Sequence, residues 1–161
     1  MMHYLKNISI DAEVPENLSE IVFGAGCFWG VEKKFWDLKG VYLTSVGYSG
    51  GHTENPTYKD VCYENTGHVE VVKVCYDPKI VSLSMILKIF WECHDPTQGM
   101  RQGNDIGTQY RSVIFCNNIC DIDVANDSKD KFQKVLNKNN YNEITTEISL
   151  LKSYYLAEEY H

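Results

Sequence analysis

One cysteine, Cys27, stands where a buried strand is expected to pass into a helix. The segment Gly24-Ala25-Gly26-Cys27-Phe28-Trp29-Gly30 follows a short apolar run and opens an amphipathic stretch. Backbone N–H groups at a helix start are unpaired and the helix dipole is positive there, so a thiolate is stabilised. Cysteines in such positions act as nucleophiles. The alternative is that Cys27 is a small core residue, which is the commonest fate of a free cysteine.

Two aromatic residues follow Cys27. Trp29 lies about 100° around the predicted helix from Phe28. It is therefore off the apolar stripe that Phe28 shares with Val31 and Phe35. Burial in the core explains Phe28 better than Trp29, so the pair predicts a cup for a small apolar group beside the cysteine. The alternative is that Trp29 packs under a long loop.

A carboxyl group, Glu70, shares one face of a predicted strand with Val72 and Val74. A carboxyl group on an apolar face loses hydration, which raises its pKa and keeps it protonated near neutral pH. A general acid needs that property. The alternative is that this end of the strand is solvated and Glu70 is an ordinary surface carboxylate.

Three tyrosines, Tyr48, Tyr58 and Tyr110, lie in or beside predicted loops. A phenol hydroxyl is a neutral donor that can hold a developing negative oxygen. A single tyrosine is, however, more often a core residue whose hydroxyl is already bonded.

The histidines and cysteines predict no metal site. The six cysteines include no C-x-x-C pair, and His94-Asp95 has no matching ligand at metal-binding spacing. His52, His68 and His94 are interpreted as residues that fix loops.

Hydrophobic patterning predicts the elements that must position these side chains. Strands are expected at 19–23, 41–48, 68–76, 111–116 and 144–151, and helices at 28–38, 58–64, 82–93 and 124–137. Residues 94–110 show no period and are expected to form a long ordered loop. These elements predict an α+β fold, in which helices pack against a mixed or antiparallel sheet.

The composition limits the function classes. The chain has 161 residues, enough for one domain, and its formal charge is −7. An acidic chain without clustered Lys and Arg is a poor candidate for binding nucleic acid or a membrane surface. The sequence shows no secretory signal and no apolar run long enough to span a membrane. We expect a cytoplasmic monomer with an N-terminal arm at 1–18 and a single catalytic domain at 19–161.

Taken together, the chain resembles the A-type peptide methionine sulfoxide reductases, enzymes that reverse the oxidation of methionine. The resemblance rests on GAGCFWG (24–30), GYSGG (47–51), NPTY (55–58), TGHVEVV (66–72), HDPTQGMRQGNDIGTQYRS (94–112) and AEEYH (157–161). These motifs occur in the family's order from about Ile21 onward. Residues 1–18 and 117–151 match weakly. The resemblance implies a two-layer α/β sandwich.

The resemblance also implies a role for each site residue. Cys27 would attack the sulfur of methionine (S)-sulfoxide, free or in a protein, and become a sulfenic acid. Glu70 would protonate the sulfoxide oxygen, and Tyr58 and Tyr110 would hydrogen-bond that oxygen. Phe28 and Trp29 would form the cup that holds the methyl group. Asp105 would help to orient the substrate or the tyrosines.

Regeneration of the sulfenic acid requires a thiol. No cofactor is expected beyond an external dithiol such as thioredoxin or glutaredoxin. Many family members carry a resolving cysteine in a tail beyond the AEEYH-like segment, a region that this sequence does not include. Cys116 and Cys120 are expected to be the more mobile internal thiols, and Cys75 and Cys93 to be packing residues. The resolving role stays open between Cys116, Cys120, a tail segment and direct attack by the external thiol.

Two other function classes fit the cysteine. A cysteine hydrolase acting by acyl transfer would need a histidine base hydrogen-bonded to the thiol. Spacing alone does not select one among His52, His68 and His94. A non-catalytic binding module would leave Cys27 buried.

Overall fold

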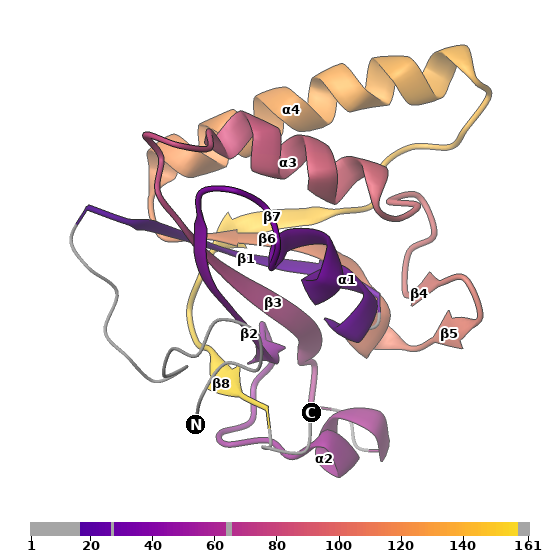
Figure 1. Cartoon of the computed structure of the whole chain (residues 1–161). Helices are drawn as coiled ribbons and strands as arrows, with labels where there is room; N and C mark the ends of the chain where they lie inside the picture. The colour runs from indigo at the N-terminus through magenta and orange to yellow at the C-terminus, as the bar shows by residue number, and fades with distance from the viewer. Residues whose placement is uncertain (1–16, 27, 64–65, 158–161) are drawn as a thin grey trace.

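A mixed sheet forms the centre of the molecule (Figure 1). The computed structural model describes residues 17–26, 28–63 and 66–157, without the side chains of Trp29 and Tyr63. The strand order is β7-β6-β1-β3-β2-β8, antiparallel except for the parallel pair β6–β7. Its strands are β1 (Ser19–Ala25), β2 (Val41–Ser49), β3 (Val69–Tyr76), β6 (Ser112–Cys116), β7 (Glu147–Leu150) and β8 (Tyr155–Leu156). The other elements are α1 (Phe28–Phe35), α2 (Tyr58–Tyr63), α3 (Leu83–Glu92), β4 (Arg101–Gln102), β5 (Asp105–Ile106), the 3₁₀ helix η1 (Thr108–Tyr110) and α4 (Ile119–Lys138).

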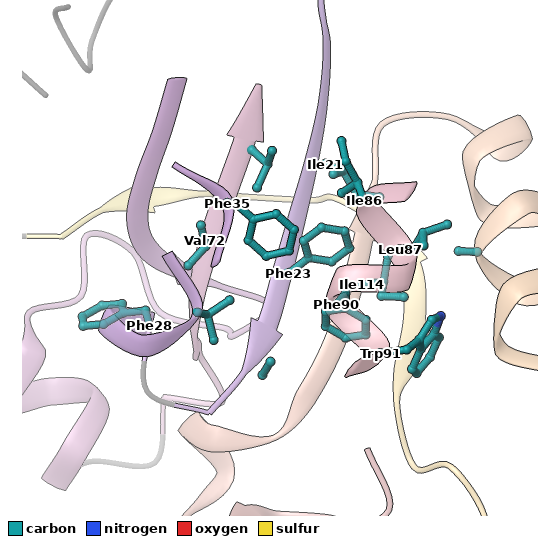
Figure 2. Packing of buried hydrophobic residues seen from close by; sticks show 14 of the residues in the cluster. Ile21, Phe23, Phe28, Phe35, Val72, Ile86, Leu87, Phe90, Trp91 and Ile114 are labelled. Atoms are coloured by element: carbon teal, nitrogen blue, oxygen red, sulfur yellow. The ribbon is translucent and has the colours of Figure 1, made fainter. Parts of the chain in front are cut away.

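Helices α1, α3 and α4 pack on one face of the sheet, with α3 and α4 side by side (Figure 1). Phe23 of β1 stacks on Phe35 of α1 and on Phe90 of α3, with ring centroids 5.5 and 4.7 Å apart. Figure 2 shows these rings at the centre of the core. Burial of aromatic rings is a large favourable term in folding, so this cluster fixes the helices on the sheet. The two-layer arrangement predicted from the sequence is confirmed.

The second face of the sheet has a smaller core. Val22, Val71 and Phe115 are buried there, with Leu151 and Tyr154 of the C-terminal segment packed against them. The Tyr154 and Ser45 hydroxyls are hydrogen-bonded at 2.7 Å. Central strands are therefore buried on both faces, which is why they appear in the sequence as continuous apolar runs rather than as alternating ones.

Side-chain caps set the starts of two helices. Ser82 accepts a hydrogen bond from the backbone N of Met85 at the start of α3. Asn118 does the same for Asp121 at the start of α4. The cap at Asn118 begins α4 at Ile119, five residues before the predicted start. Asp121 and Asp123 interrupt the apolar residues of this turn and Ile119 is exposed, so the turn forms no buried apolar stripe.

Other differences are local. Residues 94–110, expected to be a loop, include the short hairpin of β4 and β5 and the helix η1. Strand β8 was not predicted; two residues are too few to show alternation. The proposed arm falls almost wholly outside the described residues, so the division at residue 18 stays a prediction. None of the described helices has the length and apolar character needed to cross a bilayer.

Candidate active site

The strand–helix corner that carries Cys27 is described on both of its sides. Strand β1 ends at Ala25 and helix α1 begins at Phe28, whereas Cys27 itself lies outside the described residues. Gly26 has φ +97°, a conformation that favours glycine. The sequence prediction of a buried strand passing into a helix at this point is therefore confirmed for the flanking residues.

Glu70 lies beside this corner. It is 2% exposed on β3, and its Oε1 accepts a long hydrogen bond of 3.4 Å from the backbone N of Phe28, the residue that follows Cys27 in sequence. Its Oε2 is buried with no hydrogen-bond partner in the described part of the chain. Burial raises the pKa of Glu70 to about 7, the Phe28 N–H opposes this, and the negative charge of Asp105 adds to it. The carboxyl group is thus partly protonated near neutral pH.

Tyr58 and Tyr110 reach the same place from different elements. Tyr58 begins α2 and Tyr110 ends η1, and both are half-buried. The pKa of Tyr58 is raised, first by a hydrogen bond with the Cys62 thiol, then by burial and by the charges of Cys62, Tyr110 and Glu70. Since such charge effects act over short range, the Tyr110 phenol and the Glu70 carboxyl group each lie within interaction distance of Tyr58.

Asp105 and Phe28 flank the carboxyl group in different ways. Asp105 is exposed on β5, and its effect on the pKa of Glu70 places it within electrostatic range. Phe28 is 1% exposed, with its ring centroid 5.9 Å from that of Tyr48. Tyr48 pairs directly with Glu70 between β2 and β3. The side chain of Trp29, the other half of the predicted methyl cup, lies outside the description.

Two of the histidines have both ring nitrogens engaged. His68 accepts from the backbone N of Gly51 at 3.1 Å through Nδ1 and donates to the carbonyl of Thr53 at 2.7 Å through Nε2. His94 donates through Nδ1 to the carbonyl of Phe90 and accepts through Nε2 from Ser112, both at 2.8 Å. Burial lowers the pKa of His94 to about 4. Neither ring offers a free nitrogen to a nucleophile, and both connect neighbouring segments.

The cysteines expected to be mobile are differently placed. Cys116 is fully buried on β6, and burial raises the pKa of its thiol to about 12. Cys120 is exposed in the first turn of α4. Strand β6 runs antiparallel to β1 with Cys116 opposite Ile21. Ile21 is four residues, or roughly 13 Å, along the strand from Ala25 at the candidate site. Cys116 is therefore neither mobile nor close to the corner.

Cys62 is the site residue that sequence reasoning missed. Cys62 lies one turn after Tyr58 on α2, and its thiol is hydrogen-bonded with the Tyr58 hydroxyl. The spacing of four residues on a predicted helix was the signal that could have found it.

Other features of the described residues lie elsewhere. A cavity of about 390 Å³ opens between α3 and α4. Apolar side chains such as Trp91 and Phe132 line it together with polar ones such as Lys88 and Asp127, and it includes none of the predicted site residues. In the part of the chain that the structure describes, no three His, Cys, Asp or Glu side chains are grouped as ligands of a metal ion would be.

Comparisons with known proteins point to one family. Residues 19–161 match the family model described as "Peptide methionine sulfoxide reductase". The Mus musculus "Mitochondrial peptide methionine sulfoxide reductase" is 58% identical over 147 residues, which cover 91% of this chain. The chain spans 63% of the length of that relative.

Solved structures agree with the sequence match. Methionine sulfoxide reductase A of Corynebacterium diphtheriae is 39% identical, with a TM-score of 0.91 over 98% of this chain and 76% of the other. Mxr1 from Saccharomyces cerevisiae in complex with Trx2 is 26% identical, with a TM-score of 0.69 over 94% and 90%. With the motifs and the fold, these matches establish that the chain belongs to the peptide methionine sulfoxide reductase family.

Proposed function

We propose that this protein is a thiol-dependent reductase that converts methionine (S)-sulfoxide, in proteins or free, to methionine. The observation that carries the proposal is the Glu70 carboxyl group. It is buried, its pKa is raised to about 7, and it accepts from the backbone N of the residue that follows Cys27. A sulfoxide oxygen leaves poorly until it is protonated, so the reaction needs an acid of this kind close to a nucleophilic thiol.

The proposed chemistry balances as follows. The Cys27 thiolate forms a bond to the sulfoxide sulfur while Glu70 gives a proton to the oxygen. The oxygen is transferred to the Cys27 sulfur, so that methionine leaves and Cys27 becomes a sulfenic acid. Tyr58 and Tyr110 donate hydrogen bonds to the oxygen, and Asp105 orients the substrate or the tyrosines. Phe28 and Trp29 hold the methyl group.

An external dithiol completes the proposed cycle. One thiol attacks the sulfenic acid and releases water, and the second closes a disulfide in the reductant and frees Cys27. The complex of Mxr1 with Trx2 supports a thioredoxin-type donor for this relative, and glutaredoxin is the other candidate. No further cofactor enters the balance.

Direct attack by the external thiol fits the structure better than an internal resolving role, because Cys116 is buried far along β6 from the corner and Cys120 follows it by four residues at the start of α4. We therefore expect Cys116→Ser and Cys120→Ser to turn over at the wild-type rate with thioredoxin. A slower rate with thioredoxin in either variant that dithiothreitol restores would contradict direct attack by the external thiol, because a small dithiol bypasses the need for a resolving cysteine.

We further propose that the protein acts as a cytoplasmic monomer. The name of the mouse relative gives mitochondria as the other compartment.

The decisive assay measures methionine released from separate (S)- and (R)-sulfoxides with dithiothreitol as reductant. The (S) epimer should be consumed and the (R) epimer should not. Cys27→Ser should abolish release without loss of the folded state. A folded wild-type protein that releases no methionine from the (S) epimer would refute the proposal.

Glu70→Gln tests the acid. We expect the rate to fall roughly 10²- to 10⁴-fold, as for loss of a general acid. The wild-type rate should also decline as the pH rises through about 7, because Glu70 then loses its proton. Kinetics of Glu70→Gln close to those of the wild type would remove Glu70 from the mechanism. Glu143→Gln, a change at an exposed residue, is the matched control.

A further inference from the structure

The side chain of Gln102, on β4, bonds to both backbone groups of one residue in a neighbouring segment. Its Oε1 accepts from the backbone N of Asp95 at 3.0 Å, and its Nε2 donates to the carbonyl of Asp95 at 2.7 Å. The amide therefore pairs with Asp95 as one strand residue pairs with another. This contact holds the β4–β5 hairpin against the segment that follows α3.

The aliphatic part of the same side chain packs on the corner that precedes Cys27. A Cβ added at Gly26 would lie 2.9 Å from Cγ and 3.0 Å from Cβ of Gln102. Real side chains do not approach so closely. Gln102 can therefore pack at this position only because residue 26 is a glycine and has no Cβ. Gln102 is thus in direct contact with the residue before the proposed nucleophile.

The backbone of Gln102 also pairs with Asp105. The two residues are opposite one another in the β4–β5 ladder. The negative charge of Asp105 acts on Glu70 and raises its pKa. One residue therefore connects the Asp95 segment, the Gly26 corner and the strand that carries Asp105.

From these three contacts we infer that Gln102 is a positioning residue for the proposed reductase, one that sets the hairpin carrying Asp105 against the Gly26 corner. The inference rests on the proposed function. Gln102 is not assigned a contact with the substrate. Its effect is exerted through Asp105 and through the backbone next to Cys27.

Two variants separate the two halves of the side chain. Gln102→Met keeps the aliphatic packing on Gly26 and loses the two hydrogen bonds to Asp95. Gln102→Ala loses the packing as well as the two hydrogen bonds. Misplacement of a reacting group by about 1 Å can cost roughly 10²-fold in rate, and we expect a kcat loss of this order for Gln102→Ala. Gln102→Met should lose less, and KM for free methionine (S)-sulfoxide should change less than kcat.

Gln133 provides the matched control. Its Oε1 accepts from the backbone N of Ile144 at 2.8 Å and its Nε2 donates to the carbonyl of Asn142 at 3.2 Å. It therefore also fixes a backbone segment, but on α4 and without a contact at the corner. Gln133→Ala should lower the melting temperature and leave kcat and the pH profile unchanged.

The pKa of Glu70, followed by the carboxyl carbon resonance in an NMR titration, is a readout that does not depend on turnover. Besides Asp105, the titratable group that interacts with Glu70 is Tyr58, which Tyr110 also affects. In Gln102→Ala the hairpin should move away, so that Asp105 repels Glu70 less and water reaches it more. Both changes lower the pKa of Glu70, and the decline of kcat with rising pH should begin at lower pH.

The outcomes are distinct. An active wild type with a lowered Glu70 pKa and a reduced kcat in Gln102→Ala supports the inference. An active wild type with Gln102→Ala equal to Gln133→Ala in kcat and in Glu70 pKa overturns it and leaves the proposed function intact. A folded but inactive wild type overturns the proposed function and the positioning role together.

Discussion

Burial of Glu70 lowers the stability of the folded protein at neutral pH, and it also keeps the carboxyl group partly protonated for use as an acid. The carboxyl group sits on the helix-covered face of β3 with Val72 and Val74, both buried. Its environment therefore favours the protonated form, and the pKa is raised from 4.5 to about 7. A carboxyl group that holds its proton more tightly in the folded protein than in the unfolded chain destabilises the fold once the pH exceeds the unfolded value.

Glu70→Gln should therefore stabilise the protein in a pH-dependent way. Below pH 4.5 the Glu70 side chain is neutral in the folded and in the unfolded protein. Wild type and Glu70→Gln should therefore have similar free energies of unfolding there. As the pH rises from 4.5 to 7, the wild type should lose stability relative to the variant. The difference in the free energy of unfolding should reach about 3 kcal/mol at pH 8. Urea unfolding at pH 4.5 and 8 measures this, with exposed Glu143→Gln as control. A difference that does not depend on pH would show that Glu70 keeps an ordinary pKa.

Between elements, a short hydrogen-bond chain connects the end of α3 to β6 and to the residue that precedes β7. His94 bonds the carbonyl of Phe90 and the Ser112 hydroxyl, which in turn lies 2.8 Å from the Thr146 hydroxyl. The imidazole must be neutral to accept from Ser112, and burial lowers its pKa from 6.5 to about 4. The hydrogen bonds of His94 therefore persist in the folded protein until the pH nears 4. The free energy of unfolding nevertheless falls as the pH drops from 6.5 to about 4, because the unfolded chain takes up the proton that the buried imidazole does not.

His94→Gln should remove this acid sensitivity. At pH 7 the variant should be less stable by about 1–3 kcal/mol, because the Phe90 carbonyl and the Ser112 hydroxyl lose a fitted partner. As the pH falls from 6.5 toward 4 the wild type should lose about 3 kcal/mol that the variant does not, so the gap should narrow. His52→Gln, a change at an exposed histidine, is the matched control. Parallel pH dependence in wild type and His94→Gln would contradict the assignment.

Sequence patterning recovered the elements that are long and apolar, and it placed Glu70 on the correct face because strand alternation fixes which residues share a face. It missed the first turns of α4, where the Asn118 cap rather than an apolar stripe sets the start. It also missed the contacts of Gln102 with Asp95 and Gly26. Those contacts join segments far apart in the sequence, and no local period records them.

At the scale of the whole molecule, the sheet has a hydrophobic core on each face. Cysteines in its central strands are therefore buried, whereas a cysteine outside the sheet can be exposed. Cys75 on β3 and Cys116 on β6 are buried in the two strands that flank β1. Burial raises the pKa of Cys75 to about 11 and that of Cys116 to about 12. Cys120 is exposed on α4, outside the sheet. Since the thiolate is the reactive form, burial and raised pKa both slow modification of the two strand thiols.

Thiol labelling should therefore report the stability of the sheet as a unit. In native protein at pH 8, a thiol reagent should modify Cys120 at the rate of an exposed thiol, while Cys75 and Cys116 should react through unfolding. The central strands open with the whole domain, so the labelling rates of both should rise with urea at one common slope that matches the global unfolding slope. Peptide mass spectrometry after timed labelling measures each cysteine separately. If Cys116 reacted faster than Cys75 with a shallower urea dependence, β6 would open independently of β3, and the sheet would not be one cooperative unit.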